Sequence, residues 1–234
     1  MTMLLVPGFM LDDALWDDLL PFLPAGEPVQ FANLDGGGSI EAMARAVLDT
    51  APASFILLGF SMGGYVAREI ARIAPARVTA LVLVATSSRP DQPELVRQRV
   101  AAARQAAAVG AFHGLARGAI RASLHADRHD DAAMIERVRA MGARLGSDVF
   151  LRQSAVVRAG DQAALAQIAC PTLVIGAEGD QLRSVDESRE QAAGIPGAEL
   201  AIIPGSGHLL PLEAPQALGQ LITGWLRKRA GAVR

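Results

Sequence analysis

The sequence predicts an α/β fold, with a mostly parallel central sheet flanked by helices and a helical lid inserted into it. Three observations predict this fold. Short strand-like runs alternate with helical patterns, one long helical stretch interrupts the alternation, and the residues with catalytic potential follow strand-like runs directly. The chain has 234 residues, of which 51% are hydrophobic, and this is enough to bury one large core.

The predicted strands are short runs rich in Leu, Ile and Val, each bounded by turn residues. These runs are residues 3–6, 29–32, 55–59, 79–85, 172–175 and 200–203. Continuous apolar runs are typical of strands buried on both faces, as in a parallel sheet.

The predicted helices lie between these strands and show a helical period of apolar residues. They are residues 14–23, 40–48, 62–73, 184–193 and 215–229. Asp12 or Asp13 and Ser39 are suitable N-caps for the first two, and Pro215 suits the first turn of the last. Strands that alternate with helices in this way predict right-handed crossovers within one layered domain.

The alternation stops between residues 87 and 165, where Ala, Arg and Leu dominate. Helices are expected over Glu94–Val109, Ala132–Leu145 and Asp148–Val157. Because ligands of such sheets bind outside the carboxyl ends of the strands, an insertion after the strand ending at Ala85 is placed to cover a site. We therefore predict a core of residues 1–86 and 166–234 and a lid of residues 87–165.

Composition argues against several classes of function. The formal net charge is −2, from 22 basic and 24 acidic residues, so no nucleic-acid partner is expected. Cys170 is the only cysteine, which rules out an internal disulfide and a cysteine-based zinc site. No secretory signal and no apolar run long enough to span a membrane are found, so we expect a cytoplasmic protein without membrane insertion, as a monomer or homodimer.

The strongest motif is Gly59-Phe60-Ser61-Met62-Gly63, which lies between a predicted strand and a predicted helix. This is the context of a G-x-S-x-G nucleophile elbow, in which a sharp turn exposes the serine hydroxyl. The glycines two residues before and after Ser61 let strand and helix pack closely. A tight turn whose serine only caps the helix is the structural alternative.

A serine nucleophile needs a base and a group that orients the base. His208 follows the last predicted strand, and Asp180 follows the strand at residues 172–175. The resulting chain order of Ser, Asp and His is the order expected after a G-x-S-x-G elbow. Glu178 is a rival for the acid, and Asp186 and Glu187 are weaker ones.

An oxyanion intermediate requires two N–H donors. The first should be the backbone N–H of Met62, the residue after the nucleophile, and the second should come from the loop after the first strand. Pro7 has no N–H, and Gly8 allows a close approach to a ligand, so Phe9 is the preferred second donor, with Met10 as the next.

The substrate is expected to contact Phe60 and apolar side chains of the lid. These lid residues are Leu115, Ile120, Met134 and Met141. His113, Arg89 and Arg121 are further candidates, although helical spacing does not decide where they point. His125 and His129 are spaced so that both could bind a metal ion from one helix face, but a solvated surface of the lid is the preferred interpretation. Gly36–Gly38 lacks the Lys-Ser/Thr ending of a phosphate loop, so no nucleotide site is expected there.

These motifs resemble those of the α/β-hydrolase superfamily, particularly its small lidded serine esterases. The resemblance covers nearly the full chain and rests on Pro7-Gly8 followed by Trp16 and on the segments GFSMGG, CPTLVIGAEGD and PGSGHLLPLEAP. Pro7 stands where the family usually has His, and no Pro closely follows Asp180. The resemblance implies an acyl-enzyme mechanism on Ser61, His208 and Asp180, with no cofactor and no metal.

The predicted function is therefore hydrolysis of a small carboxylic ester with an apolar acyl group. The same three residues would also serve a lactonase, a hydrolase of carbon–carbon bonds or a cofactor-free perhydrolase with haloperoxidase activity. A non-catalytic receptor with the same fold is the alternative from a different class.

Overall fold

The computed structural model describes residues 1–108 and 112–232 and contains a six-stranded parallel sheet. The sheet has the order β2-β1-β3-β4-β5-β6, and each neighbouring pair is parallel. Its strands are β1 (Thr2–Val6), β2 (Val29–Phe31), β3 (Phe55–Phe60), β4 (Val78–Val84), β5 (Thr172–Ala177) and β6 (Glu199–Ile203). The predicted fold class and all six predicted strands are confirmed, with small shifts at the strand ends.

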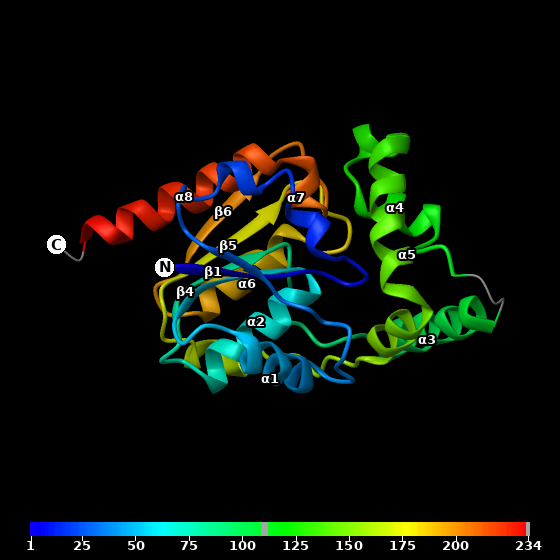
Figure 1. Ribbon diagram of the computed structural model, residues 1–234, viewed down its shortest axis with the longest axis horizontal. Helices are drawn as coiled ribbons and strands as arrows, with labels where there is room; N and C mark the ends of the chain where they lie inside the picture. Colours follow the sequence, from blue (N-terminus) through cyan, green and yellow to red (C-terminus); the bar gives the residue numbers. More distant parts are fainter. Residues whose placement is uncertain (109–111, 233–234) are drawn as a thin grey trace.

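Side chains of the strands alternate between two apolar cores, one on each face of the sheet. Met3 and Leu5 of β1 enter one core, whereas Leu4 and Val6 enter the other. Helices cover both faces, so all six residues of β3 are buried (Figure 1). This double burial explains why the strands read as continuous apolar runs in the sequence.

The helices of one face are α1 (Ile40–Thr50), α2 (Met62–Ile73) and α6 (Val185–Gly194). Those of the other face are α7 (Leu210–Glu213) and α8 (Pro215–Ala232). Ser39 caps α1 by accepting a hydrogen bond from the Ala42 N–H at 3.1 Å, and Ser184 and Glu187 form a capping box at α6. The helices predicted over residues 40–48, 62–73, 184–193 and 215–229 are confirmed.

The helix predicted over residues 14–23 is wrong. Two short 3₁₀ helices, η1 (Asp13–Trp16) and η2 (Leu20–Phe22), take its place. Pro21 has no N–H to donate to an α-helical turn, and its ring disfavours the α conformation at the preceding residue. The apolar residues of this segment still face the core, because Leu15, Trp16 and Leu19 are all buried there.

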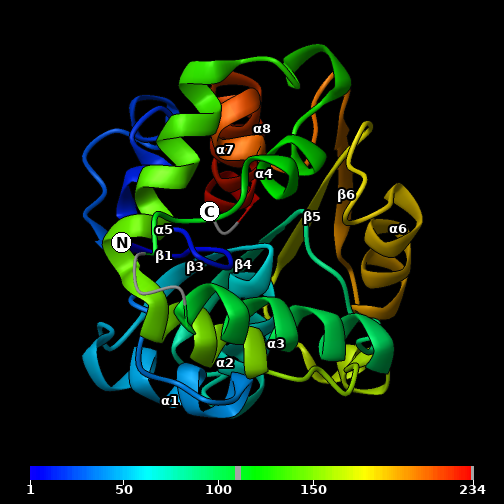
Figure 2. The ribbon, with the colours of Figure 1, turned by 90° about the vertical axis from the view of Figure 1, so that its right-hand side faces the viewer.

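The predicted lid contains three α-helices that lie across the carboxyl end of the sheet (Figures 1 and 2). They are α3 (Pro93–Ala108), α4 (Arg117–Ser123) and α5 (Ala132–Ala155), and short 3₁₀ helices follow α4 and α5 at Ala126–Arg128 and Gln162–Gln167. The two helices expected over 132–145 and 148–157 form the single element α5, which is broken by Gly146 at φ 82° and ψ 174°. Val109, the predicted end of the first lid helix, lies outside the described residues.

None of the helices in the described ranges combines the length and the apolar character that crossing a membrane requires.

Candidate active site

Ser61 lies in a strained turn between β3 and α2. Its backbone has φ 51° and ψ −114°, a conformation that non-glycine residues rarely adopt. The turn is held on both sides, because the Ser61 N–H donates to the Val84 oxygen at 2.9 Å and the Thr86 hydroxyl donates to the Ser61 oxygen at 2.8 Å. The local fold thus fixes the serine in place at the N-terminus of a helix.

Gly59 and Gly63 make this turn sterically possible. A Cβ on Gly59 would lie 2.6 Å from the Gly63 oxygen and 2.7 Å from the Ala67 Cβ. A Cβ on Gly63 would collide with the backbone oxygens of Val6 and Pro7. Both positions therefore exclude any side chain, which is the physical reason for the small residues in the motif.

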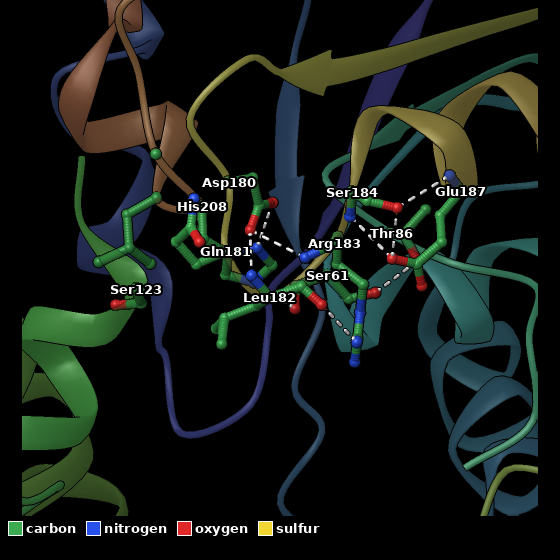
Figure 3. A network of polar contacts seen from close by, with 12 residues as sticks. Ser61, Thr86, Ser123, Asp180, Gln181, Leu182, Arg183, Ser184, Glu187 and His208 are labelled. Carbon is green, nitrogen blue, oxygen red and sulfur yellow. Dashed lines mark hydrogen bonds and ion pairs between the residues drawn. The ribbon is translucent and has the colours of Figure 1, made fainter. Parts of the chain in front are cut away.

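The structure brings together three residues that lie far apart in the chain (Figure 3). His208 Nε2 lies 2.8 Å from Ser61 Oγ, and His208 Nδ1 lies 2.7 Å from Asp180 Oδ2. The side chains of His208 and Asp180 are 6% and 0% exposed, so bulk water competes weakly for these contacts. The arrangement is that of a nucleophile, a base and an orienting acid.

The second carboxylate oxygen of Asp180 is also occupied. Its Oδ1 accepts hydrogen bonds from the backbone N–H groups of Leu182 at 2.7 Å and Arg183 at 2.9 Å. These bonds fix the plane of the carboxylate and hence the direction of the His208 ring.

The three rival acids lie in other interactions. Glu178 accepts a hydrogen bond from the Gly205 N–H at 3.3 Å, Glu187 caps α6, and Asp186 pairs with an arginine of the same helix. Asp180 is thus the acid that contacts the His208 ring in the structure.

The two residues predicted to donate to the oxyanion, Phe9 and Met62, line the same cavity as Ser61. Met62 is the first residue of α2, so its N–H has no partner within the helix. The Met10 N–H donates to the Gln153 Oε1 at 2.8 Å and is therefore not available to a ligand. Within the described residues the Phe9 N–H has no hydrogen-bond partner, and Phe9 lines the same cavity as Ser61.

Ser61 opens into a cavity of about 410 Å³ that lies between the sheet and the lid. Its lining is mostly apolar and includes Phe60 together with Leu115, Ile120 and Val138 of the lid. A cavity of this size and polarity suits a small substrate with an apolar chain.

Two of the predicted contact residues are not in this lining. Met141 is fully buried and Met134 is partly buried, and both pack into the apolar cluster that joins the lid to the sheet. Their side chains pack the lid against the core, and their contact with substrate stays a prediction.

Three arginines, Arg99, Arg158 and Arg183, also line the cavity, and the sequence patterns did not single them out. The arginines suggested from the sequence bind acids elsewhere: Arg89 binds Glu190 at 2.6 Å, and Arg121 lies 3.4 Å from Asp130. The suggested His113 does not line the cavity either. Arg158 and Arg183 lie in loops, where no periodic signal exists, and the helical spacing around Arg99 on α3 does not show which face of that helix meets the cavity.

Asp91 holds two of these arginines beside the cavity. Burial alone would raise the pKa of Asp91, but the hydrogen bonds and charge of Arg158, with a further contribution from Arg99, outweigh burial and hold that pKa below its usual range. Arg158 also contacts the Tyr65 hydroxyl and stacks over its ring, with 4.4 Å from guanidinium carbon to ring centre.

Sequence reasoning also missed Glu213. Its buried carboxylate accepts hydrogen bonds from the backbone N–H groups of Gly207 at 3.2 Å and Leu209 at 3.0 Å, on either side of His208. It also accepts one from the backbone N–H of His125 in the lid at 2.7 Å. A glutamate within the strongly apolar segment LLPLEAP was the signal that could have identified it.

Gln153, on α5 of the predicted lid, was missed as well. It is 3% exposed, accepts a hydrogen bond from the Met10 N–H, and donates one to the Leu34 oxygen at 3.2 Å. The lid therefore holds the loop that carries Phe9.

The first histidine of the lid pair takes part in a hydrogen bond within the lid. His125 Nδ1 accepts a hydrogen bond from the Asp127 N–H at 3.3 Å. Over the ranges that the structure describes, no group of three or more His, Cys, Asp or Glu residues is placed to hold a metal ion.

Comparison with known proteins places the chain among hydrolases. A model described as the Alpha/beta hydrolase family matches residues 3–221. A pimeloyl-[acyl-carrier protein] methyl ester esterase of Photobacterium profundum is 41% identical over 95 residues, a match that spans only 37% of this chain and 37% of that relative. A protein of the same name from Aromatoleum aromaticum is 28% identical over 258 aligned residues, covering 96% of this chain and 98% of the relative.

Solved structures show the same similarity. A thermophilic esterase from Thermogutta terrifontis, determined with malate bound, has a TM-score of 0.80 and 29% sequence identity. The match covers 97% of this chain and 90% of that one.

Proposed function

The chain belongs to the alpha/beta hydrolase family and is an esterase-like enzyme, and on that premise we propose that it cleaves carboxylic esters through an acyl-enzyme on Ser61. The observation that carries the proposal is the continuous contact from Ser61 Oγ through the His208 ring to Asp180, at 2.8 and 2.7 Å. A serine that only capped a helix would need neither contact.

In the first half of the proposed reaction, Ser61 Oγ attacks the ester carbonyl carbon while its proton passes to His208 Nε2. The backbone N–H groups of Phe9 and Met62 stabilise the negative charge that develops on the carbonyl oxygen. The carbon–oxygen bond of the leaving group then breaks, and the alcohol takes the proton from His208. Asp180 orients the imidazole and stabilises its charged form.

In the second half, a water molecule attacks the acyl carbon and gives its proton to His208 Nε2. The bond between the acyl carbon and Ser61 Oγ breaks, the proton returns to the serine, and the carboxylic acid leaves. We propose that residues 87–165 act as the lid that keeps this cavity apart from bulk water.

The apolar cavity supports an ester with an apolar acyl chain as the substrate class. The names of the relatives extend this proposal to methyl esters of pimeloyl chains carried on an acyl-carrier protein. Such a substrate would place its methyl ester at Ser61 and leave the carrier outside the lid.

The proposal is tested with a panel of chromogenic esters of graded acyl length, beside a lactone, a diketone, and peroxide with acetate. Ser61→Ala should lower turnover of the preferred ester by on the order of a millionfold, whereas Ser54→Ala, at an exposed position before β3, should retain it. A Ser61→Ala variant whose turnover equals that of the parent chain would refute the proposal. Preference for the lactone or the diketone would assign the chain to lactone hydrolysis or carbon–carbon bond hydrolysis instead of ester hydrolysis.

A fluorophosphonate probe separates an enzyme from a receptor of the same fold. The parent chain and Ser54→Ala should be labelled, and Ser61→Ala should not. Absence of labelling in the parent chain would favour the receptor.

A further inference from the structure

The charged groups that line the cavity of Ser61 are of one sign. Arg99, Arg158 and Arg183 line it, and no Asp or Glu is among the described lining residues. The remaining lining is mainly apolar, so these guanidinium groups are the main charges that an apolar substrate would meet there.

Two of these arginines already have a carboxylate partner. Arg158 pairs with Asp91, and Arg99 Nη2 lies 3.4 Å from the same carboxylate. Arg99 also donates to the backbone oxygens of Ser154 at 2.9 Å and Val156 at 2.6 Å. One acid therefore balances two cations, and its side chain is only 6% exposed.

Arg183 has no carboxylate partner within the described residues. Its Nη1 donates to the Leu182 oxygen at 2.7 Å, whereas its Nε is buried and makes no hydrogen bond to the part of the chain that the structure describes. A buried donor without an acceptor is costly, so this guanidinium is left for a group that the polypeptide does not supply.

The position of Arg183 relates it to the catalytic residues. Its backbone N–H donates to Asp180 Oδ1 at 2.9 Å, and its side chain leaves the same loop that carries Asp180 (Figure 3). Asp180 forms no ion pair with this guanidinium among the described residues, and its two oxygens contact His208 and two backbone N–H groups instead. The backbone of Arg183 is thus fixed beside the triad, while its side chain lines the same cavity as Ser61.

We infer that the substrate is an ester that carries an anionic group, a carboxylate or a phosphate, and that Arg183 binds this group while the apolar cavity takes the chain. Guanidinium groups bind both anions through paired, charge-assisted hydrogen bonds. The inference rests on the proposed esterase function and adds the charge of the substrate to it.

The experiment compares matched pairs of esters with the intact chain. In one arm, monomethyl esters of dicarboxylic acids are compared with methyl esters of monocarboxylic acids of equal length. In the other arm, the anionic group is on the alcohol, as a glycolate or glycerol phosphate ester compared with its neutral counterpart. A preference in kcat/KM of about tenfold to a hundredfold for the anionic member is expected in one arm, and that arm identifies where the charge lies.

The variants assign the preference to a residue. Arg183→Leu and Arg183→Gln should bring the ratio of kcat/KM for the two esters close to one, mainly through KM, and Arg183→Lys should keep part of it. Arg189→Leu is the matched control, because Arg189 is exposed on α6, pairs with Asp186 and does not line the cavity. Its ratio should equal that of the parent chain.

A ratio near one in both arms for the parent chain overturns the inference. A preference that survives in both Arg183→Leu and Arg183→Gln overturns the assignment to Arg183. Either result leaves the esterase proposal intact as long as hydrolysis of the neutral ester still depends on Ser61.

Discussion

Replacing Arg68 with methionine should remove a large part of the stability of the protein. Arg68 lies on α2 and is 2% exposed. Its guanidinium donates to both oxygens of Asp161 at 2.6 and 2.9 Å, to Gln191 Oε1 at 2.9 Å and to the Ser87 oxygen at 2.6 Å. It therefore joins α2 to α6, to the loop after β4 and to the end of the lid.

The expected loss follows from the acceptors that would be left behind. Gln191 and Ser87 are both buried, and each orphaned oxygen costs about 1–3 kcal/mol, giving roughly 2–6 kcal/mol for the two. Asp161 adds little because its side chain is 34% exposed and can be rehydrated. A central value of about 4 kcal/mol corresponds to a fall in Tm of about 8–16 °C for a chain of this size.

The assay is urea unfolding followed by circular dichroism, with a thermal scan beside it. Arg72→Met is the matched control on the same helix, because Arg72 is 42% exposed and pairs only with Glu69 three residues earlier. Its unfolding free energy should change by less than about 0.5 kcal/mol. If Arg68→Met cost under about 1 kcal/mol, or no more than Arg72→Met, the reasoning from buried acceptors would be refuted.

Two further predictions concern the site and its surroundings. Gln153→Met removes the acceptor of the Met10 N–H, so the loop that presents the Phe9 N–H is no longer held. We expect kcat to fall about tenfold to a hundredfold with little change in KM. Steady-state kinetics check this prediction, and an unchanged kcat would contradict it. Asp91→Asn should destabilise the protein at neutral pH. Burial alone would raise the pKa of Asp91, but Arg158 and Arg99 hold it below the usual range, so its contribution is complete above about pH 4 and is lost as the pH falls through the folded-state pKa. Urea unfolding at a series of pH values should therefore show a constant difference between the two proteins above about pH 4 and a shrinking difference as the pH falls further. A difference that stays constant well below about pH 4 would oppose the prediction.

The residues of the elbow show how much local sequence can predict. Gly59, Ser61 and Gly63 are close together in the chain, and the requirement for small residues around a strained turn is a local steric one. The strands were equally accessible, because burial on both faces leaves continuous apolar runs such as β4. The meeting of the three triad residues could be predicted because each follows a strand of the same parallel sheet, and the carboxyl ends of such strands lie at one edge.

Local patterns carry less information where packing between distant segments decides the outcome. Met134 and Met141 have the composition of a substrate-binding face, but the way α5 lies on the core turns them into packing residues. In the same way, Gln153 and Glu213 act on loops to which they are not adjacent in sequence, so no periodicity indicates their partners.

The sequence by itself determined the sheet, its flanking helices and the three residues that meet at its carboxyl edge. The spacing of apolar residues, the small residues required at tight turns and the order of the strands are all local properties of the sequence. Only the tertiary structure decided which lid side chains reach the cavity, which acid faces His208 and which arginine is left without a partner. Those outcomes depend on distances between segments that are far apart in the chain, and local sequence patterns do not predict such distances.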